Sequence, residues 1–246
     1  MYVSQRTLLF PGAAWGSGAP PSVPAWGESV LIDTPDGERL HALHAAAENG
    51  RPTVLFFLGN ADSVNHYGFL AEALGRRGAG LLALSYRGYG GSTGRPSEPG
   101  LLADGLAAFD WLAQGGQDRV VLLGQSLGTA VAVHVAAERP ARGAILVSAF
   151  DSALALARSF YPFLPVGPLI KDPFRSDLRI AGVTQPKLFI HGDRDGVIPI
   201  RFGRALYERA PEPKSFRLHA GYGHNDLWSS ALVDDIVGFV EETGDG

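Results

Sequence analysis

The chain has 246 residues, of which 46% are hydrophobic and 19% charged, a composition that fits one globular domain and excludes a disordered or fibrous protein. Its formal net charge of −4 offers no basic footprint for nucleic acid or for an anionic membrane. The absence of cysteine excludes disulfides, thiolate catalysis and cysteine-based metal sites.

Short apolar runs alternate with helical patterns along most of the chain. Bounded apolar runs of this kind are typical of buried parallel strands, and their alternation with helices predicts an α/β fold. We therefore expect a doubly wound, mostly parallel sheet in a single domain over residues 1–246. The expected strands cover 28–33, 39–45, 53–58, 80–86, 120–123, 144–148, 187–191 and 215–218, and the helices cover 63–76, 100–113, 127–137, 201–209 and 226–242.

One apolar stretch, residues 149–182, breaks this rhythm. Four prolines interrupt it, so one long helix is excluded. Because it follows a strand at the carboxyl edge of the sheet, we expect a short lid whose Phe160 and Phe163 line a substrate pocket. The alternative is that these residues form extra helices packed on the core.

The segment Gly124-Gln125-Ser126-Leu127-Gly128 fits the pattern G-x-S-x-G. It follows an apolar strand and opens a helix of small residues, which is the setting of a nucleophile elbow. The flanking glycines would let helix and strand approach closely while the serine occupies a strained turn. We therefore predict Ser126 as a catalytic nucleophile.

A serine nucleophile needs a base to accept its proton and an acid to orient that base. In this architecture the chain order is Ser, then Asp or Glu, then His, and two later strands end in loops with such residues. For the acid, Asp195 and Asp193 are both candidates, and we favour Asp195 because an apolar anchor follows it. For the base we favour His224, in a glycine-containing loop, over His219 at a strand end.

An oxyanion hole for such a serine needs two N–H donors. The N–H of Leu127 comes with the elbow itself. The second donor should lie in the loop after the 53–58 strand, where Asn60 is the best candidate and Ala61 the neighbour that could replace it.

The sequence resembles the α/β-hydrolases, in the branch that contains protein depalmitoylases and many bacterial serine hydrolases. The resemblance spans residues 5–227 and rests on motifs at 58–61, 86–92, 124–128, 191–199 and 223–226. It implies that the aspartate of His-Gly-x-x-Asp, Asp195, is the acid and that the histidine of Gly-His-Asn-Asp, His224, is the base. Members of that branch often carry a membrane anchor before the matching part. This sequence shows no such anchor, so we expect a cytoplasmic protein, or a membrane-associated one if an anchor was removed.

The leading hypothesis is a serine esterase or thioesterase that works through an acyl-enzyme on a small-molecule ester or thioester of short to medium acyl chain. An amidase or peptidase with the same triad is a second interpretation, and a non-catalytic binding protein on the same fold is a third. The remaining histidines show no metal-ligand spacing, so we expect no metal and no cofactor. We expect no nucleic-acid partner and no transmembrane segment in this chain, because no apolar run approaches the roughly 20 residues that a span needs. The oligomeric state is left open.

Overall fold

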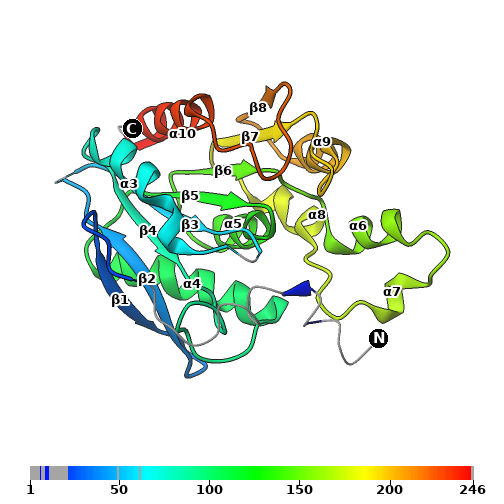
Figure 1. Ribbon diagram of the computed structural model, residues 1–246, viewed down its shortest axis with the longest axis horizontal. Coiled ribbons are helices and arrows are strands. Elements are labelled where there is room, and N and C mark those ends of the chain that lie inside the picture. The colour runs from blue at the N-terminus through cyan, green and yellow to red at the C-terminus, as the bar shows by residue number, and fades with distance from the viewer. Residues whose placement is uncertain (1–5, 7–8, 11–21, 49, 61, 245–246) are drawn as a thin grey trace.

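The computed structural model describes residues 6, 9–10, 22–48, 50–60 and 62–244, and it arranges them as an eight-stranded sheet with helices on both faces (Figure 1). The strand order is β1-β2-β4-β3-β5-β6-β7-β8. β2 pairs antiparallel with both β1 and β4, and the other neighbouring strands pair in parallel. The predicted α/β-hydrolase architecture is confirmed.

Every predicted strand is present, and none departs from its predicted ends by more than two residues. The first hairpin matches at both ends, because its turn is set locally: the Thr34 N–H donates to Glu38 O, and Gly37 adopts a positive φ of 88°. The strands are β1 (Glu28–Asp33), β2 (Arg39–Ala45), β3 (Thr53–Phe57), β4 (Gly80–Leu84), β5 (Val120–Gln125), β6 (Gly143–Val147), β7 (Lys187–Gly192) and β8 (Lys214–His219).

The predicted helices also form, with two differences. The 63–76 pattern divides into a short 3-10 turn and a helix, and the last helix begins at Ser230 rather than at 226. The helices are η1 (Val64–Tyr67), α3 (Gly68–Gly75), α4 (Glu98–Gln114), α5 (Leu127–Glu138), α6 (Ala153–Phe160), α7 (Val166–Leu169), α8 (Ser176–Arg179), η2 (Ile180–Gly182), α9 (Ile200–Arg209) and α10 (Ser230–Gly244). Within the described residues, no helix combines the length and apolar character that crossing a bilayer requires.

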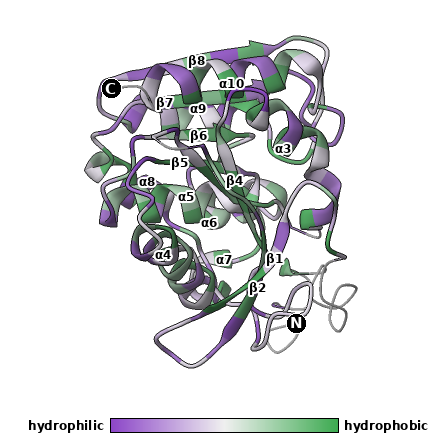
Figure 2. Ribbon diagram, turned by 90° about the vertical axis from the view of Figure 1, so that its left-hand side faces the viewer, coloured by the Kyte–Doolittle hydropathy of each residue, from purple (hydrophilic) through white to green (hydrophobic). Residues whose placement is uncertain are grey.

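Two apolar cores lie on opposite faces of the sheet. Alternate residues of each central strand point to opposite faces, so Val54 and Phe56 of β3 join one core while Leu55 and Phe57 join the other. The first core includes side chains from α3 and α10, and the second includes side chains from α4, α5 and α9. Figure 2 accordingly shows apolar strands in the middle of the molecule and mixed polar and apolar helices outside them.

The insertion at 149–182 leaves the carboxyl end of β6 and returns to β7. Its helices α6 and α7 project from the body of the molecule as an arm, here defined as residues 152–171 (Figure 1). No residue of α6 or α7 is fully buried. The alternative that the insertion packs on the core nevertheless holds in part, because Ala153, Ala155 and Leu156 on one side of α6 are partly buried and pack against the core, whereas α7 supplies no buried residue. α8 and η2, which follow, do supply buried residues, namely Ser176 and Ile180.

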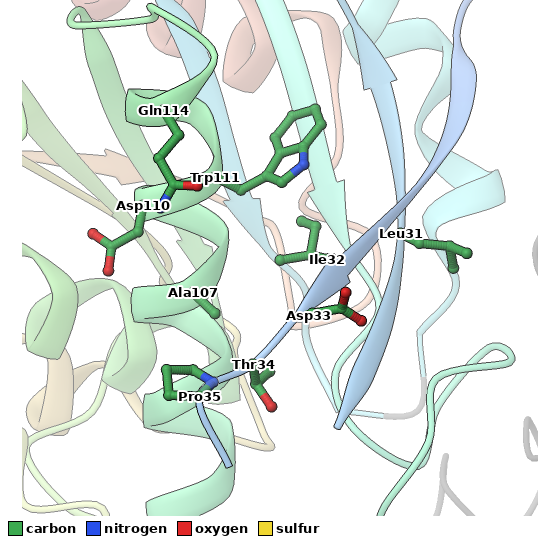
Figure 3. Close-up of a pocket in the computed structure, with 9 residues that line it drawn as sticks. All are labelled: Leu31, Ile32, Asp33, Thr34, Pro35, Ala107, Asp110, Trp111 and Gln114. Atoms are coloured by element: carbon green, nitrogen blue, oxygen red, sulfur yellow. The ribbon is translucent and has the colours of Figure 1, made fainter. Parts of the chain in front are cut away.

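A hollow of about 480 Å³ lies between β1 and α4 (Figure 3). Ile32 of β1 and Trp111 of α4 face it, whereas Leu31 points to the other side of the strand. Its two carboxylates are already paired, Asp33 with Arg39 and Asp110 with Arg139. Its lining contains none of the predicted catalytic residues.

Candidate active site

Ser126 sits in a strained turn between β5 and α5. Its φ of 51° and ψ of −117° are values that a side chain disfavours and that cost of the order of 1–3 kcal/mol. The two glycines of the motif make the turn possible. A Cβ on Gly128 would lie 2.0 Å from Phe57 O, and one on Gly124 would lie 2.5 Å from Gly128 O. The strand–turn–helix expected around Ser126 is thus present, and its geometry presents the serine at the carboxyl edge of the sheet.

Ser126, His224 and Asp195 form one chain of hydrogen bonds. His224 Nε2 lies 3.1 Å from Ser126 Oγ, and His224 Nδ1 lies 2.7 Å from Asp195 Oδ2. Because a carboxylate only accepts hydrogen bonds, Nδ1 carries the imidazole proton, and Nε2 is left to accept the serine proton. Ser126 directly follows β5, and Asp195 and His224 lie in the loops after β7 and β8.

The Asp195 carboxylate is held rigidly inside the protein. Its side chain is fully buried, and Oδ1 accepts hydrogen bonds from the N–H groups of Val197 at 2.9 Å and Ile198 at 2.7 Å. Burial by itself raises the pKa of Asp195, but the hydrogen bonds from His224 and the Ile198 N–H outweigh it, and the pKa lies below its ordinary value. Asp195 is therefore ionised at neutral pH and can orient His224.

His191 supports this acid loop, a role that the sequence reasoning missed. It is 1% exposed, its Nε2–H donates to Ile198 O at 2.8 Å, and the same nitrogen lies 3.5 Å from Asp195 Oδ2. Burial lowers the pKa of His191, so the ring is neutral at pH 7. A Cβ on Gly203 of α9 would lie 2.5 Å from His191 Nδ1, so the backbone of this helix packs directly against the imidazole ring. The signal in the sequence is the His-Gly pair that ends β7.

The loop expected to form the oxyanion hole passes close to the nucleophile. A Cβ on Gly59 would lie 3.7 Å from Ser126 Cβ. The side chain of Asn60 anchors this loop, since it donates to Leu9 O and accepts from Tyr89 Oη at 2.9 Å. Leu127 is the first residue of α5, where an N–H has no partner within the helix. The alternative donor Ala61 lies outside the described residues.

The candidates that we did not favour have other contacts. Asp193 Oδ1 accepts from the Gly221 N–H at 2.6 Å, and His219 Nε2 lies 2.9 Å from Asp235 Oδ2 on α10. Asp226 does not begin the last helix as the sequence suggested. It instead accepts from the Gly223 N–H at 2.6 Å, which ties the loop that carries His224.

Phe160 and Phe163 do not line a closed pocket. Phe160, the last residue of α6, is 52% exposed, and Phe163, in the turn between α6 and α7, is 97% exposed. Phe163 therefore occupies neither a pocket wall nor the core, since a side chain so exposed contacts almost nothing.

Comparisons with known proteins agree with this architecture. Residues 52–169 match the model of a family described as the alpha/beta hydrolase fold. An uncharacterized protein of Mycobacterium tuberculosis is 40% identical over 97% of this chain and 88% of its own length. The alpha/beta hydrolase domain-containing protein WAV2 of Arabidopsis thaliana is 31% identical over 82% of this chain and 74% of its own. Among solved structures, the Pyrococcus furiosus esterase Pf2001 superposes with a TM-score of 0.72 at 20% identity, covering 93% of this chain and 97% of that one.

Proposed function

The chain belongs to the α/β-hydrolase family, and from that premise we propose that it is a serine hydrolase that cleaves carboxylic esters or thioesters through an acyl-enzyme. One observation carries the proposal. Ser126 Oγ and Asp195 Oδ2 lie 3.1 and 2.7 Å from the two ring nitrogens of His224, which is the arrangement that activates a serine hydroxyl.

The first half-reaction transfers the acyl group to the enzyme. His224 Nε2 accepts the proton of Ser126 while Oγ attacks the carbonyl carbon of the substrate. The negative charge that develops on the carbonyl oxygen would be stabilised by the N–H groups of Leu127 and Asn60. The intermediate then expels the alcohol or thiol, which takes its proton from His224.

The second half-reaction returns the enzyme to its starting state. Water gives a proton to His224 Nε2 and attacks the acyl-enzyme carbonyl, and the tetrahedral intermediate releases the carboxylic acid as Ser126 regains its proton. Throughout, Asp195 remains ionised and stabilises the positive charge on the imidazole.

For the acyl group we propose short to medium, uncharged chains. Two features support this choice of acyl group. The insertion is apolar, and the described part of its arm is short and does not form a long lid that could enclose an extended chain. The resemblance to the branch that contains depalmitoylases makes thioesters the alternative to oxygen esters as substrates. Phe160, at the end of α6, is the side chain to test for acyl-chain preference, since Phe163 has no surrounding wall.

The first experiment is labelling with a fluorophosphonate, which reacts only with an activated serine. We expect wild-type protein to be labelled and Ser126→Ala to be unlabelled. Hydrolysis of a p-nitrophenyl ester series and of matched acyl thioesters then gives the preferred substrate, and an anilide series tests the amidase alternative. Labelling that persists in Ser126→Ala would contradict the assignment, and absence of labelling in the wild type would favour a binding protein.

A further inference from the structure

The end of the arm carries a continuous apolar surface. We call residues 160–165 the arm tip, and all six of them, Phe-Tyr-Pro-Phe-Leu-Pro, are exposed. Phe163 is 97% exposed, Tyr161 59% and Leu164 51%. Isolated exposed apolar residues are common, but a contiguous run of six that includes three aromatic rings marks an interaction surface.

The base of the arm is fixed to the body of the protein. The Leu154 N–H donates to Pro173 O at 3.2 Å, and this hydrogen bond joins the segment that enters the arm to the segment that leaves it. The buried Asp172 accepts from the Glu98 N–H at 2.8 Å and pairs with Arg6 at 2.9 Å. Within the arm, the guanidinium of Arg158 on α6 lies against Gly167 on α7. The tip is therefore held away from the core by these contacts.

The arm also differs in charge from the rest of the chain. Residues 152–171 contain Arg158 and Lys171 and no acidic residue, whereas the whole chain has a net charge of −4. A third cation stands beside α6, because Arg201 donates to Ser159 Oγ at 2.7 Å. The arm thus combines an exposed aromatic end with nearby basic side chains, on a protein that is otherwise acidic. The expectation that the chain has no basic footprint for an anionic membrane rests on the net charge of the whole chain and does not hold for this segment.

From these observations we propose that the arm tip docks on a lipid bilayer that contains anionic lipid. Aromatic and leucine side chains partition into the boundary between headgroups and acyl chains, and Tyr161 suits that boundary because its ring is apolar and its hydroxyl polar. Arg158, Lys171 and Arg201 would then lie at the level of anionic headgroups.

A second copy of the chain fits this surface less well. A stable protein interface uses about 20–30 residues from each partner, far more than the six of the tip. The basic side chains behind two facing tips would also repel each other. A narrow, projecting, apolar end with cations behind it matches a fluid surface into which it can insert.

Docking would orient the molecule on the membrane. The arm leaves the sheet at the carboxyl end of β6 (Figure 1). Ser126 follows the carboxyl end of β5 and His224 follows that of β8, at the same edge of the sheet. That edge would therefore face the bilayer. The docking itself rests only on the surface of the arm and does not depend on the hydrolase chemistry.

Vesicle flotation of the full chain tests the proposal. We expect binding to phosphatidylcholine vesicles that contain phosphatidylglycerol, weaker binding to phosphatidylcholine alone, and a loss of affinity of at least about tenfold in the Phe163→Ser/Leu164→Ser double variant. Leu31→Ser is the matched control, since Leu31 is 50% exposed on β1, far from the arm, and its affinity should be unchanged. Arg158→Gln/Lys171→Gln should weaken binding to the anionic vesicles only.

Because the chain has no cysteine, a single label can report the contact directly. An environment-sensitive fluorophore attached after Phe163→Cys should shift to the blue on adding anionic vesicles, and one attached after Leu31→Cys should not. Absence of vesicle binding, or an equal loss in the double variant and the Leu31→Ser control, would overturn the proposal. A dimer in sedimentation experiments that the double variant converts to monomer, together with an absence of vesicle binding, would also overturn the proposal.

Discussion

Under the proposed function, catalysis and local stability place opposite demands on Ser126. A positive φ favours glycine, yet the chain keeps a side chain there because the hydroxyl must stand at the edge of the sheet. The glycine spacing in the sequence predicts this turn, since only glycine tolerates the close approach of α5 to β3. The chain order of a triad also predicts Asp195 and His224 as its partners. The contact itself depends on the assembled sheet, because Ser126 and His224 are separated by 98 positions in the sequence.

Replacing Ser126 by glycine and by alanine separates strain from chemistry. Both variants should lose hydrolysis by several powers of ten, since a triad acts as a unit. Ser126→Gly should nevertheless be more stable than Ser126→Ala by about 1 kcal/mol, because only glycine is at ease at this φ and ψ. Urea unfolding measures the difference. At Glu72, an exposed position in α3, the order should be reversed, with alanine the more stable.

Asp195 and Asp193 provide a matched pair of substitutions. Asp195→Asn should reduce kcat by about 10³–10⁴, because an amide no longer holds the imidazole in the tautomer that accepts the serine proton. Asp193→Asn should keep most of the activity, since that carboxylate accepts from the Gly221 N–H and, among the described residues, contacts neither Ser126 nor His224 through a hydrogen bond. Steady-state hydrolysis of one p-nitrophenyl ester compares them. A larger loss for Asp193→Asn would reverse the assignment of the acid.

His191 should make stability depend on pH. Its pKa in the folded protein is below the value of about 6.5 in the unfolded chain, so below that pH the unfolded chain binds the proton more readily. The contribution of His191 to the free energy of unfolding should therefore fall as the pH is lowered from about 7 to 5. Other buried groups titrate in the same range, with His134 acting in the same direction and Asp104 in the opposite one, so the prediction concerns the difference between two proteins: the stability of the wild type relative to His191→Gln should fall over this range. Thermal unfolding across this pH range gives both slopes.

At the scale of elements, strands were easier to predict than the segments between them. A buried parallel strand is apolar on both faces, so its residues alone reveal it, and the 28–45 hairpin is set by its own turn. The start of α10 was harder. Asn225 and Asp226 look like a helix start, but the Asp226 carboxylate accepts a hydrogen bond from the Gly223 N–H instead. The helix begins after Ser229, whose Oγ accepts from the Leu232 N–H in the first turn.

The arm shows a different limit of sequence reasoning. Its apolar residues predict burial, and the structure buries only part of them: Ala153, Ala155 and Leu156 of α6 pack against the core, whereas residues 160–165 are exposed. Phe163→Ala should consequently change the free energy of unfolding by less than about 0.5 kcal/mol. Phe174→Ala, at a fully buried ring of the same segment, should cost about 3–5 kcal/mol. Urea titration of the two variants measures this contrast, and equal losses would show that Phe163 is packed.

At the scale of the whole molecule, one buried ion network joins distant parts of the fold. Arg87, after β4, donates through its backbone N–H and its Nε to Asp104 on α4, each at 2.8 Å, and through Nη1 to Asp36 in the first hairpin at 2.7 Å. Asp104 is fully buried, and burial raises its pKa to about 6 against the lowering effect of Arg87. Arg87 lowers the pKa of the exposed Asp36 to about 2.

Removing Arg87 should therefore be costly and pH-dependent. Arg87→Met should lose about 3–5 kcal/mol at neutral pH, because it leaves the Asp104 carboxylate buried without its partner. The folded state binds the Asp104 proton more tightly than the unfolded chain, so this carboxylate reduces stability as the pH rises through about 6. Without Arg87 its pKa should rise further, and the deficit should be larger at about pH 8 than at about pH 5. Asp36→Asn, at a half-exposed partner, should cost about 1 kcal/mol or less by the same urea titrations.

Under the proposed function, the parallel order of the sheet also governs when reactivity first arises as the chain folds. Ser126 follows β5, but the histidine bonded to it follows β8, so neither part of the chain is reactive alone. Pairing of strands so distant in sequence is slow, because loop closure precedes the contacts that reward it. A chain emerging from the ribosome would hold an inert serine until its last strand had docked. In a refolding experiment, capture of a fluorophosphonate would then lag behind the recovery of secondary structure and time the completion of the native sheet.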